Sequence, residues 1–532
     1  MRLCFSFVSL LILLAPLCLV GEPAKTVGIV IIETGAEDGV WLESIKMIEI
    51  LRSQGFDVKI ITGKHWGSEE TLIGAPTRIR EIFTPRYGVP QEIYDAAFEN
   101  PIPEEASATK PLKVPQAEVE KLSVPPSTPV HLVTAKENDQ LREKLKATSQ
   151  EIERELRKWI AEENIDVIVS QNANAIPMHA PLGEAIKNVA EDPNLKLASV
   201  FHNHDHPWER GEKYLGSPYG AAVDVVKESF PGPLERTSVL VINEHNRRAL
   251  QERYEKESHK LPNVMDFNDQ RFGKKDAYNG DLMEALQEIH PFPIPEDALL
   301  LGQVTRVVGR KNIEASIELL KGINEKRGDK KTFLVITGEE SIGDKRPYKK
   351  ELSELAKRLG VSEQVVWAAD IVKPTRRSRD EGNKKVYSLS DFYAHLAERG
   401  MMTYPSTYEG FGNAFVEAVL AKVPIIANNY EPIFWEELGQ YGFDVVQMWA
   451  GKASPSVIEE THLYLKTIEE KDSGVKEMVE RNFQIGKKHF SYERAGEIIR
   501  GAISEAVEMA NTQKSANLSL PCHSSYTQLQ TD

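Results

Sequence analysis

The sequence is poor in cysteine and carries fewer basic than acidic residues. Its three cysteines, Cys4, Cys18 and Cys522, lie near the two ends, so the core has neither a disulfide framework nor a thiolate metal site. With 65 Lys and Arg against 80 Asp and Glu, the net charge is −15. Binding to nucleic acid needs a basic footprint, so we expect no nucleic-acid partner. A single polyphosphate ligand, in contrast, needs only a few cations and backbone amides.

Long apolar runs are also scarce, and the one that could span a bilayer lies between residues 3 and 20. Because Arg2 precedes it, this run predicts a signal peptide or an N-terminal membrane anchor over residues 1–24. The protein would then lie in a secretory lumen or at a membrane. Leu19 makes a poor cleavage site. The alternative is a mis-assigned start codon, in which case the protein is cytoplasmic.

The sequence does contain two arrays in which strand and helix patterns alternate. A chain of 532 residues is too long for one hydrophobic core. Short β-branched runs alternate with helical patterns from residue 26 to 243, and again from residue 298 to 427. Such alternation predicts an α/β fold with two Rossmann-like parallel-sheet domains, whose ligands bind at the carboxyl ends of the strands.

The expected domain boundaries follow from where the alternation stops. The segment around 266–297 is rich in proline and polar residues, which is typical of a linker. The last residues are polar and are expected to be disordered. The predicted parts are a first domain at 25–265 with a proline-rich insertion near 101–129, the linker at 266–297, a second domain at 298–490, a closing helix at 491–510 and a tail at 511–532.

The segment Tyr404–Glu417 carries the most specific pattern. A strand ends at Tyr404, a glycine-rich turn follows, and a helix is predicted to begin near Gly412. Unpaired amides and the helix dipole make such a helix start a site for anions. Glu409 and Glu417 could accept hydroxyl groups from a sugar and a ribose. The alternative is that both are solvated residues near a helix start. The predicted ligand-binding residues of this segment are Glu409, Gly410, Phe411, Gly412, Asn413 and Glu417.

This segment resembles the family 4 glycosyltransferases, which have the GT-B fold. Their signature is two glutamates separated by seven residues, and Glu409 and Glu417 have that spacing within an E-G-F-G context. The family also carries an Arg and a Lys after the first strand of the second domain, which here are Arg306 and Lys311. Lys422 departs from the family, because many members have glycine at this position.

The resemblance implies two domains that face across a cleft, with a nucleotide-sugar donor bound to the second domain. Arg306 and Lys311 would stabilise the diphosphate leaving group electrostatically. Surface basic residues at a helix start are the alternative, which the helix dipole disfavours. The family is usually independent of metal, so no metal and no further cofactor are expected.

The run His202–Arg210 follows the predicted strand Lys196–Phe201. Family members often have a histidine after a similar strand that contacts the donor sugar, and His202 is the best positional match. His204, Asp205 and His206 are competent metal ligands, but no fourth ligand is evident, so we predict no metal site. A structural role for some of these histidines is the other hypothesis. The predicted acceptor-side residues are Gly39, His204, Trp208 and Arg210.

The sequence therefore predicts a retaining glycosyltransferase that moves a hexose from a nucleotide sugar to an acceptor hydroxyl. Glu409, Arg306, Lys311 and His202 are its expected catalytic residues. The acceptor stays open and could be a glycan, a lipid or a small polar molecule. Two alternatives remain: a nucleotide-sugar epimerase or hydrolase on the same fold, and a sugar-binding relative without catalysis.

Overall fold

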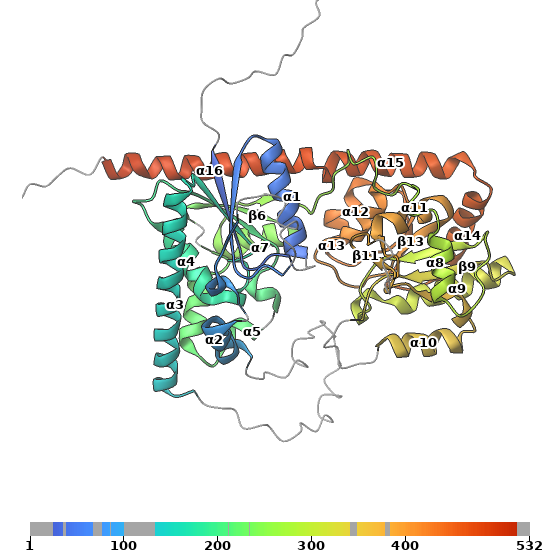
Figure 1. Ribbon diagram of the computed structural model, residues 1–532, viewed down its shortest axis with the longest axis horizontal. Coiled ribbons are helices and arrows are strands. Elements are labelled where there is room, and N and C mark those ends of the chain that lie inside the picture. The colour runs from blue at the N-terminus through green and yellow to red at the C-terminus, as the bar shows by residue number, and fades with distance from the viewer. Residues whose placement is uncertain are drawn as a thin grey trace, which may run out of the picture.

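Two parallel sheets dominate the computed structural model (Figure 1). It describes residues 25–35, 39–66, 77–85, 87–99, 133–210, 212–232, 235–340, 348–377 and 384–518. The predicted leader, the proline-rich insertion and the end of the predicted tail lie outside these residues. Over the ranges given, no helix combines the length and the apolar character needed to cross a bilayer.

The first sheet has seven parallel strands in the order β3-β2-β1-β4-β5-β6-β7. Its central strands are β-branched runs buried on both faces, as parallel strands covered by helices must be. The strands are β1 (Thr26–Ile31), β2 (Asp57–Thr62), β3 (Thr77–Ile79), β4 (Val167–Gln171), β5 (Ala198–Asn203), β6 (Thr237–Val241) and β7 (His259–Lys260). The main helices around them are α1 (Gly39–Ser53), α2 (Gly88–Phe98), α3 (Ala135–Glu162), α4 (Ala180–Glu191), α6 (Gly220–Ser229) and α7 (Glu244–Tyr254).

The second sheet has six parallel strands in the order β10-β9-β8-β13-β14-β15. They are β8 (Leu299–Gln303), β9 (Thr332–Ile336), β10 (Val365–Trp367), β13 (Gly400–Tyr404), β14 (Ile425–Asn428) and β15 (Val446–Met448). The helices are α8 (Leu282–Ile289), α9 (Ile313–Arg327), α10 (Tyr348–Arg358), α11 (Leu389–Arg399), α12 (Asn413–Leu420), α13 (Ile433–Glu437), α14 (Pro455–Glu469) and α15 (Ser473–Phe490). The two sheets confirm the predicted fold class.

The strand order determines where ligands can bind. In the second sheet, β8 lies between β9 and β13, so the connections after β8 and β13 lead to opposite faces of the sheet. A crevice opens at the carboxyl ends of two such strands. The loop with Arg306 and Lys311 follows β8, and the segment with Glu409 follows β13. The fold therefore brings together two loops that are about a hundred residues apart in the sequence.

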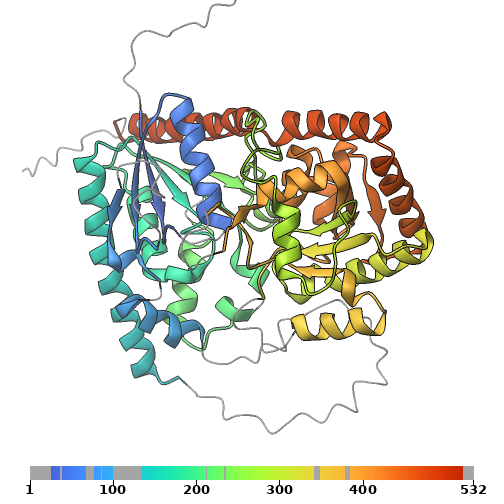
Figure 2. The same cartoon turned by 45° about the vertical axis from the view of Figure 1, so that its right-hand side comes forward.

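The last helix ties the end of the chain to the first domain. Helices α15 and α16 (Tyr492–Leu518) follow one another along one side of both domains (Figures 1 and 2). The apolar face of α16 packs into the core of the first sheet through Ala495, Ile499 and Ile503. The Met265 amide donates to the Phe490 carbonyl at 2.9 Å, so the two crossings between the domains lie side by side. Helix α16 runs to Leu518, well past the predicted end at 510.

The segment predicted as a linker is not a free connection. It contains α8, and Leu282 and Leu286 of this helix are fully buried in the core of the second domain. Because proline and polar residues flank the helix, the average composition of the segment does not reveal the apolar face of α8. Part of the predicted linker therefore belongs to the second domain.

The domains also touch through α7 and α13. Glu437, which is 1% exposed, accepts a hydrogen bond from the Glu244 amide at the start of α7, and its other oxygen lies 3.3 Å from the ammonium of Lys260. Arg248 forms an ion pair with the neighbouring Glu436. Burial raises the pKa of Glu437 to about 7, because Lys260 and the amide offset only part of the lost hydration.

Leu286→Ala tests whether α8 is part of the core. Because Leu286 is fully buried, the substitution should lower the free energy of unfolding by about 2–5 kcal/mol. Glu284→Ala, on the exposed side of the same helix, should change it by less than about 0.5 kcal/mol. Denaturant titration of both variants measures this difference, and equal stabilities would show that α8 is dispensable to the core.

Glu437→Gln tests the contact between α7 and α13. A carboxyl group with a raised pKa favours the folded state below its unfolded pKa of about 4.3, and this contribution is lost as the pH rises to about 7. The melting temperature of the wild type should therefore fall more steeply between these pH values than that of Glu437→Gln. Glu469→Gln, at a surface ion pair on α14, should keep the wild-type slope. Identical slopes for all three proteins would contradict the assignment.

Candidate active site

A hollow of about 890 Å³ lies between the two domains at the carboxyl ends of their strands. The first domain contributes Gly39 and Leu42 of α1, with Ile242 and Asn263. The second domain contributes the loops after β8, β9 and β13, including residues 304–306, 310–311, 337–340 and 409–414, together with Glu417. All predicted residues of the Glu409–Glu417 segment, as well as Arg306, Lys311 and Gly39, line this one hollow.

Glu409 holds two cations. It is 7% exposed, and the guanidinium of Arg310 donates to its Oε2 at 2.6 Å, while the ammonium of Lys311 donates to its Oε1. Burial alone would raise the pKa of Glu409, but Lys311 and Arg310 outweigh burial and hold the pKa below its usual range. Glu409 is therefore ionised at neutral pH.

Lys311 and Arg306, two cationic groups of the hollow, differ in exposure. Burial lowers the pKa of Lys311, and the nearby Arg310 and Arg306 act in the same direction, while Glu409 opposes them. Arg306 is exposed, and within the residues described its guanidinium has no carboxylate partner. An anion bound in the hollow would have Arg306 available and would compete with Glu409 for Lys311.

The turn before α12 brings backbone close to the hollow. Gly412 has a φ of 153°, and a methyl group there would lie 2.6 Å from the hydroxyl oxygen of Tyr430. Only glycine fits, which explains why the sequence has it. No side chain caps the start of α12, so its first amides remain available to an anion. Phe411 is buried beneath the turn, and Gly410 and Asn413 face the hollow.

Glu417 lies one helical turn deeper than the start of α12. The hydroxyl of Tyr393 donates to its Oε2 at 3.1 Å. Burial raises the pKa of Glu417, and the ammonium of Lys46 on α1 of the first domain is the strongest influence in the opposite direction. Lys46 in turn forms an ion pair of 2.6 Å with the buried Glu43. Charged groups of both domains therefore lie close enough to interact beside Glu417.

His202 is placed differently from the prediction. Strand β5 runs to Asn203, two residues beyond its predicted end, so His202 lies within the sheet, where its register partner is Gln171. Its Nδ1 donates to the Gln171 Oε1 at 3.1 Å. Burial keeps the pKa of His202 well below its usual value, so the ring is neutral, and its buried Nε2 has no hydrogen-bond partner among the residues that the structure describes. His202 does not line the hollow.

The predicted acceptor-side residues of this run, His204, Trp208 and Arg210, do not line the hollow either. His204 pairs with the Gln171 amide at 3.2 Å, and the ring of Trp208 stacks on His206 with centroids 4.4 Å apart. Arg210 is exposed and forms an ion pair of 2.8 Å with Asp205. Burial lowers the pKa of His204 to about 4 and that of His206 to about 3, so both rings are neutral. Among the side chains that the structure places, no group of three or more His, Cys, Asp and Glu is arranged to hold a metal ion.

The structure adds residues that the sequence did not single out. Arg310, the neighbour of Lys311 in the sequence, bonds the Glu409 carboxylate. Asn243 donates to the Gly410 carbonyl at 2.9 Å, and Asn263 donates to the Asn413 side chain at 2.7 Å. Both bonds cross from the first domain to the glycine-rich turn. An asparagine that follows a strand is only a weak sequence signal for a site residue. The hydrogen-bond partners of Asn243 and Asn263 are also more than 140 residues away in the sequence.

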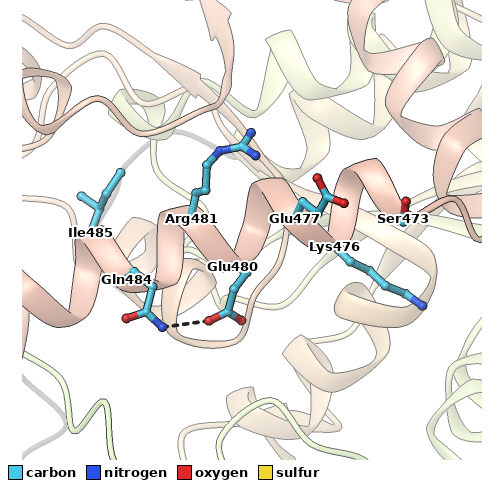
Figure 3. Close-up of a pocket in the computed structure, with 7 residues that line it drawn as sticks. All are labelled: Ser473, Lys476, Glu477, Glu480, Arg481, Gln484 and Ile485. Atoms are coloured by element: carbon cyan, nitrogen blue, oxygen red, sulfur yellow. Dashed lines mark hydrogen bonds between the residues drawn. The ribbon is translucent and has the colours of Figure 1, made fainter.

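A second hollow, of about 810 Å³, lies along α15 (Figure 3). All the side chains that line it belong to this one helix, and two of its charged groups are engaged elsewhere. Glu480 accepts hydrogen bonds from Gln484 and Lys422, and Arg481 pairs with Asp444 at 3.1 Å.

Lys422 has a φ of 57°, which explains the glycine that many family members have there. It points to α15, and it does not line the hollow between the domains.

Comparison with known proteins shows which family the chain resembles. Residues 286–442 match the family model of the glycosyl transferases group 1. The mannosylglucosylglycerate synthase of Thermotoga maritima is 30% identical over 352 residues, which cover 63% of this chain and 75% of that protein. The enzyme of the same name from Petrotoga mobilis is 31% identical over 300 residues, which cover 54% of this chain and 64% of that protein.

Solved structures extend the likeness to the whole fold. The Anabaena HepE protein, solved in complex with UDP and glucose, has a TM-score of 0.52 and covers 90% of this chain and 99% of its own. At 14% identity this likeness concerns the fold alone. Together with the family match and the first relative, it shows that this chain is an enzyme of the two-domain GT-B fold and belongs to the group 1 glycosyltransferases.

Proposed function

We propose that the protein transfers a hexose from a nucleotide-sugar donor to an acceptor hydroxyl, with retention of the anomeric configuration. The observation that carries this proposal is the hollow at the carboxyl ends of β8 and β13. Arg306, Lys311 and the uncapped start of α12 meet there beside the ionised Glu409. Cations and backbone amides suit a diphosphate, and the adjacent carboxylate suits the hydroxyl groups of a sugar.

Each of these groups has a separate role in the proposal. Arg306, Lys311 and the α12 amides bind the diphosphate and stabilise the negative charge that it gains as the bond to the sugar breaks. Glu409 accepts hydrogen bonds from hydroxyl groups of the transferred sugar. Glu417, deeper in the hollow, accepts hydrogen bonds from the ribose. His202 is buried within β5 and does not line the hollow, so we leave it out of the proposed contacts.

Retention follows from attack on the face of the sugar that the diphosphate leaves. The acceptor oxygen forms a bond to the anomeric carbon as the bond from that carbon to the phosphate oxygen breaks. The proton of the acceptor hydroxyl passes to the departing phosphate oxygen. No protein nucleophile is needed, and no metal takes part in the proposed step.

The names of the two relatives suggest which substrates to try first. Both are synthases of mannosylglucosylglycerate, a product in which mannose is joined to glucosylglycerate. We therefore propose a nucleotide-activated mannose as donor and a small polar acceptor of the glucosylglycerate type. A screen of UDP-, GDP- and ADP-sugars by thermal shift identifies the donor, because a bound ligand raises the melting temperature.

Lys311→Ala and Glu409→Ala test the proposed donor site. With the donor that the screen identifies, each should lower kcat/KM by about 100- to 1,000-fold, because each removes a group that stabilises the transition state. Lys350→Ala, an exposed lysine of α10 outside the hollow, is the control and should retain wild-type activity. Near wild-type activity of either test variant would show that the site is wrongly assigned.

Product analysis with and without acceptor separates the alternatives. An altered sugar nucleotide formed without acceptor would favour an epimerase, and free sugar with nucleoside diphosphate would favour a hydrolase. Donor binding without turnover across glycan, lipid and small polar acceptors would favour a non-catalytic relative.

The stereochemistry is a separate prediction. The linkage formed should have the same anomeric configuration as the donor, because the acceptor attacks from the face that the phosphate leaves. NMR of the purified product measures the one-bond coupling between the anomeric carbon and its proton, which distinguishes the two anomers of a mannoside as well as those of other hexosides. An inverted product would exclude the proposed front-face step and leave the donor site unaffected.

A further inference from the structure

Arg310 and Lys311 share one carboxylate, although only Lys311 is expected to bind the donor. The Arg310 guanidinium bonds the Glu409 Oε2 at 2.6 Å, and the Lys311 ammonium bonds the Oε1. The Lys311 side chain is 12% exposed and that of Arg310 is 36% exposed. Each oxygen of the buried carboxylate thus has its own cation.

Arg310 also fixes the backbone on which Glu409 stands. Its guanidinium donates to the Tyr408 carbonyl at 2.9 Å. Its own carbonyl accepts hydrogen bonds from the Thr407 amide at 2.9 Å and from the Thr407 hydroxyl at 3.2 Å. One residue of the loop after β8 therefore holds three consecutive residues of the loop after β13.

The proposed function gives Lys311 and Glu409 different partners once the donor is bound. Lys311 then faces the diphosphate, and the Glu409 Oε1 faces a sugar hydroxyl, so their mutual ion pair must break. A buried carboxylate that loses its cation tends to take up a proton, and a protonated Glu409 would be a poorer acceptor for hydroxyl groups.

We propose that Arg310 is a positioning residue that holds Glu409 in place and ionised while Lys311 transfers from Oε1 to the donor diphosphate. This inference rests on the proposed function, and it assigns to Arg310 a role distinct from diphosphate binding. Arg310 stays hydrogen-bonded to the Oε2 of Glu409 before and after the donor binds. The Oε1 of Glu409 is then free to accept a hydrogen bond from the sugar.

The other titratable groups around Glu409 do not replace Arg310. Burial and the charge of Glu409 raise the pKa values of Tyr404 and Tyr430 well above the usual range, so both remain neutral hydroxyls. Arg306 contributes a charge near Lys311 but has no bond to Glu409. Once Lys311 has moved, Arg310 is the cation in contact with this carboxylate.

The test is the number of protons taken up when a nucleoside diphosphate binds. Calorimetric titration of the full chain with UDP, GDP or ADP, in buffers of different ionisation enthalpy, measures this number without any turnover. Arg310→Gln should take up more protons than the wild type as the pH falls from about 8 to about 5.5, approaching about one additional proton. Arg310→Lys should stay close to the wild type.

Two further variants separate this role from a merely structural one. Arg157→Gln is the matched control, because Arg157 is 34% exposed and bonds Glu153 and Asp192 on the far side of the first domain. It should behave as the wild type. In the double variant Arg310→Gln with Glu409→Gln, the additional proton should disappear, since the group that takes it up is gone.

The outcomes are distinct. An Arg310→Gln variant that binds the nucleotide with wild-type proton uptake overturns the inference, whatever its melting temperature, and leaves the proposed function intact. A wild type that binds none of the three nucleotides overturns both the proposed donor site and this inference. A wild type that binds but does not transfer contradicts only the proposed function.

Discussion

Two parallel sheets can share one binding hollow only where their carboxyl edges face each other, and the C-terminal helix enforces that arrangement. Helix α16 leaves the second domain beside Met265 and packs its apolar face on the first sheet. The bonds from Asn243 and Asn263 to the glycine-rich turn then close the two edges on each other. The donor loops would have no first-domain wall without this packing.

Several charged groups in and around the hollow are paired within the protein itself. Glu409 pairs with both Lys311 and Arg310, while Lys46 from the first domain pairs with Glu43 and acts electrostatically on Glu417. Burying these groups is costly, and pairing them offsets that cost. A donor that carries its own negative charge must therefore exchange ion pairs with the site. Arg306 is exposed and has no carboxylate partner among the residues described, so it can pair with an incoming anion without giving up another ion pair.

Much of the fold and of the donor loops could be predicted from the sequence, because both depend on local patterns. The short strand pattern that ends at Tyr404 and the spacing of Glu409 and Glu417 are continuous in the chain. The acceptor side could not be predicted as well. Whether His202 lies inside β5 or after it depends on its pairing with Gln171 on another strand. Helix α8 and the role of Arg310 likewise depend on contacts with distant segments, which no local pattern encodes.

The adjacency of Met265 and Phe490 constrains how the molecule can move. Both crossings of the chain that the structure describes lie within one hydrogen bond of each other. Two domains that are joined along one short edge can separate by rotation about that edge, which then acts as a hinge axis. Asn263 is two residues from this axis, so its bond to Asn413 would be stretched less than a contact farther from the axis. Substrate entry and product release would therefore involve a rotation of one domain relative to the other. The glycine-rich turn would lie near the hinge axis of this rotation.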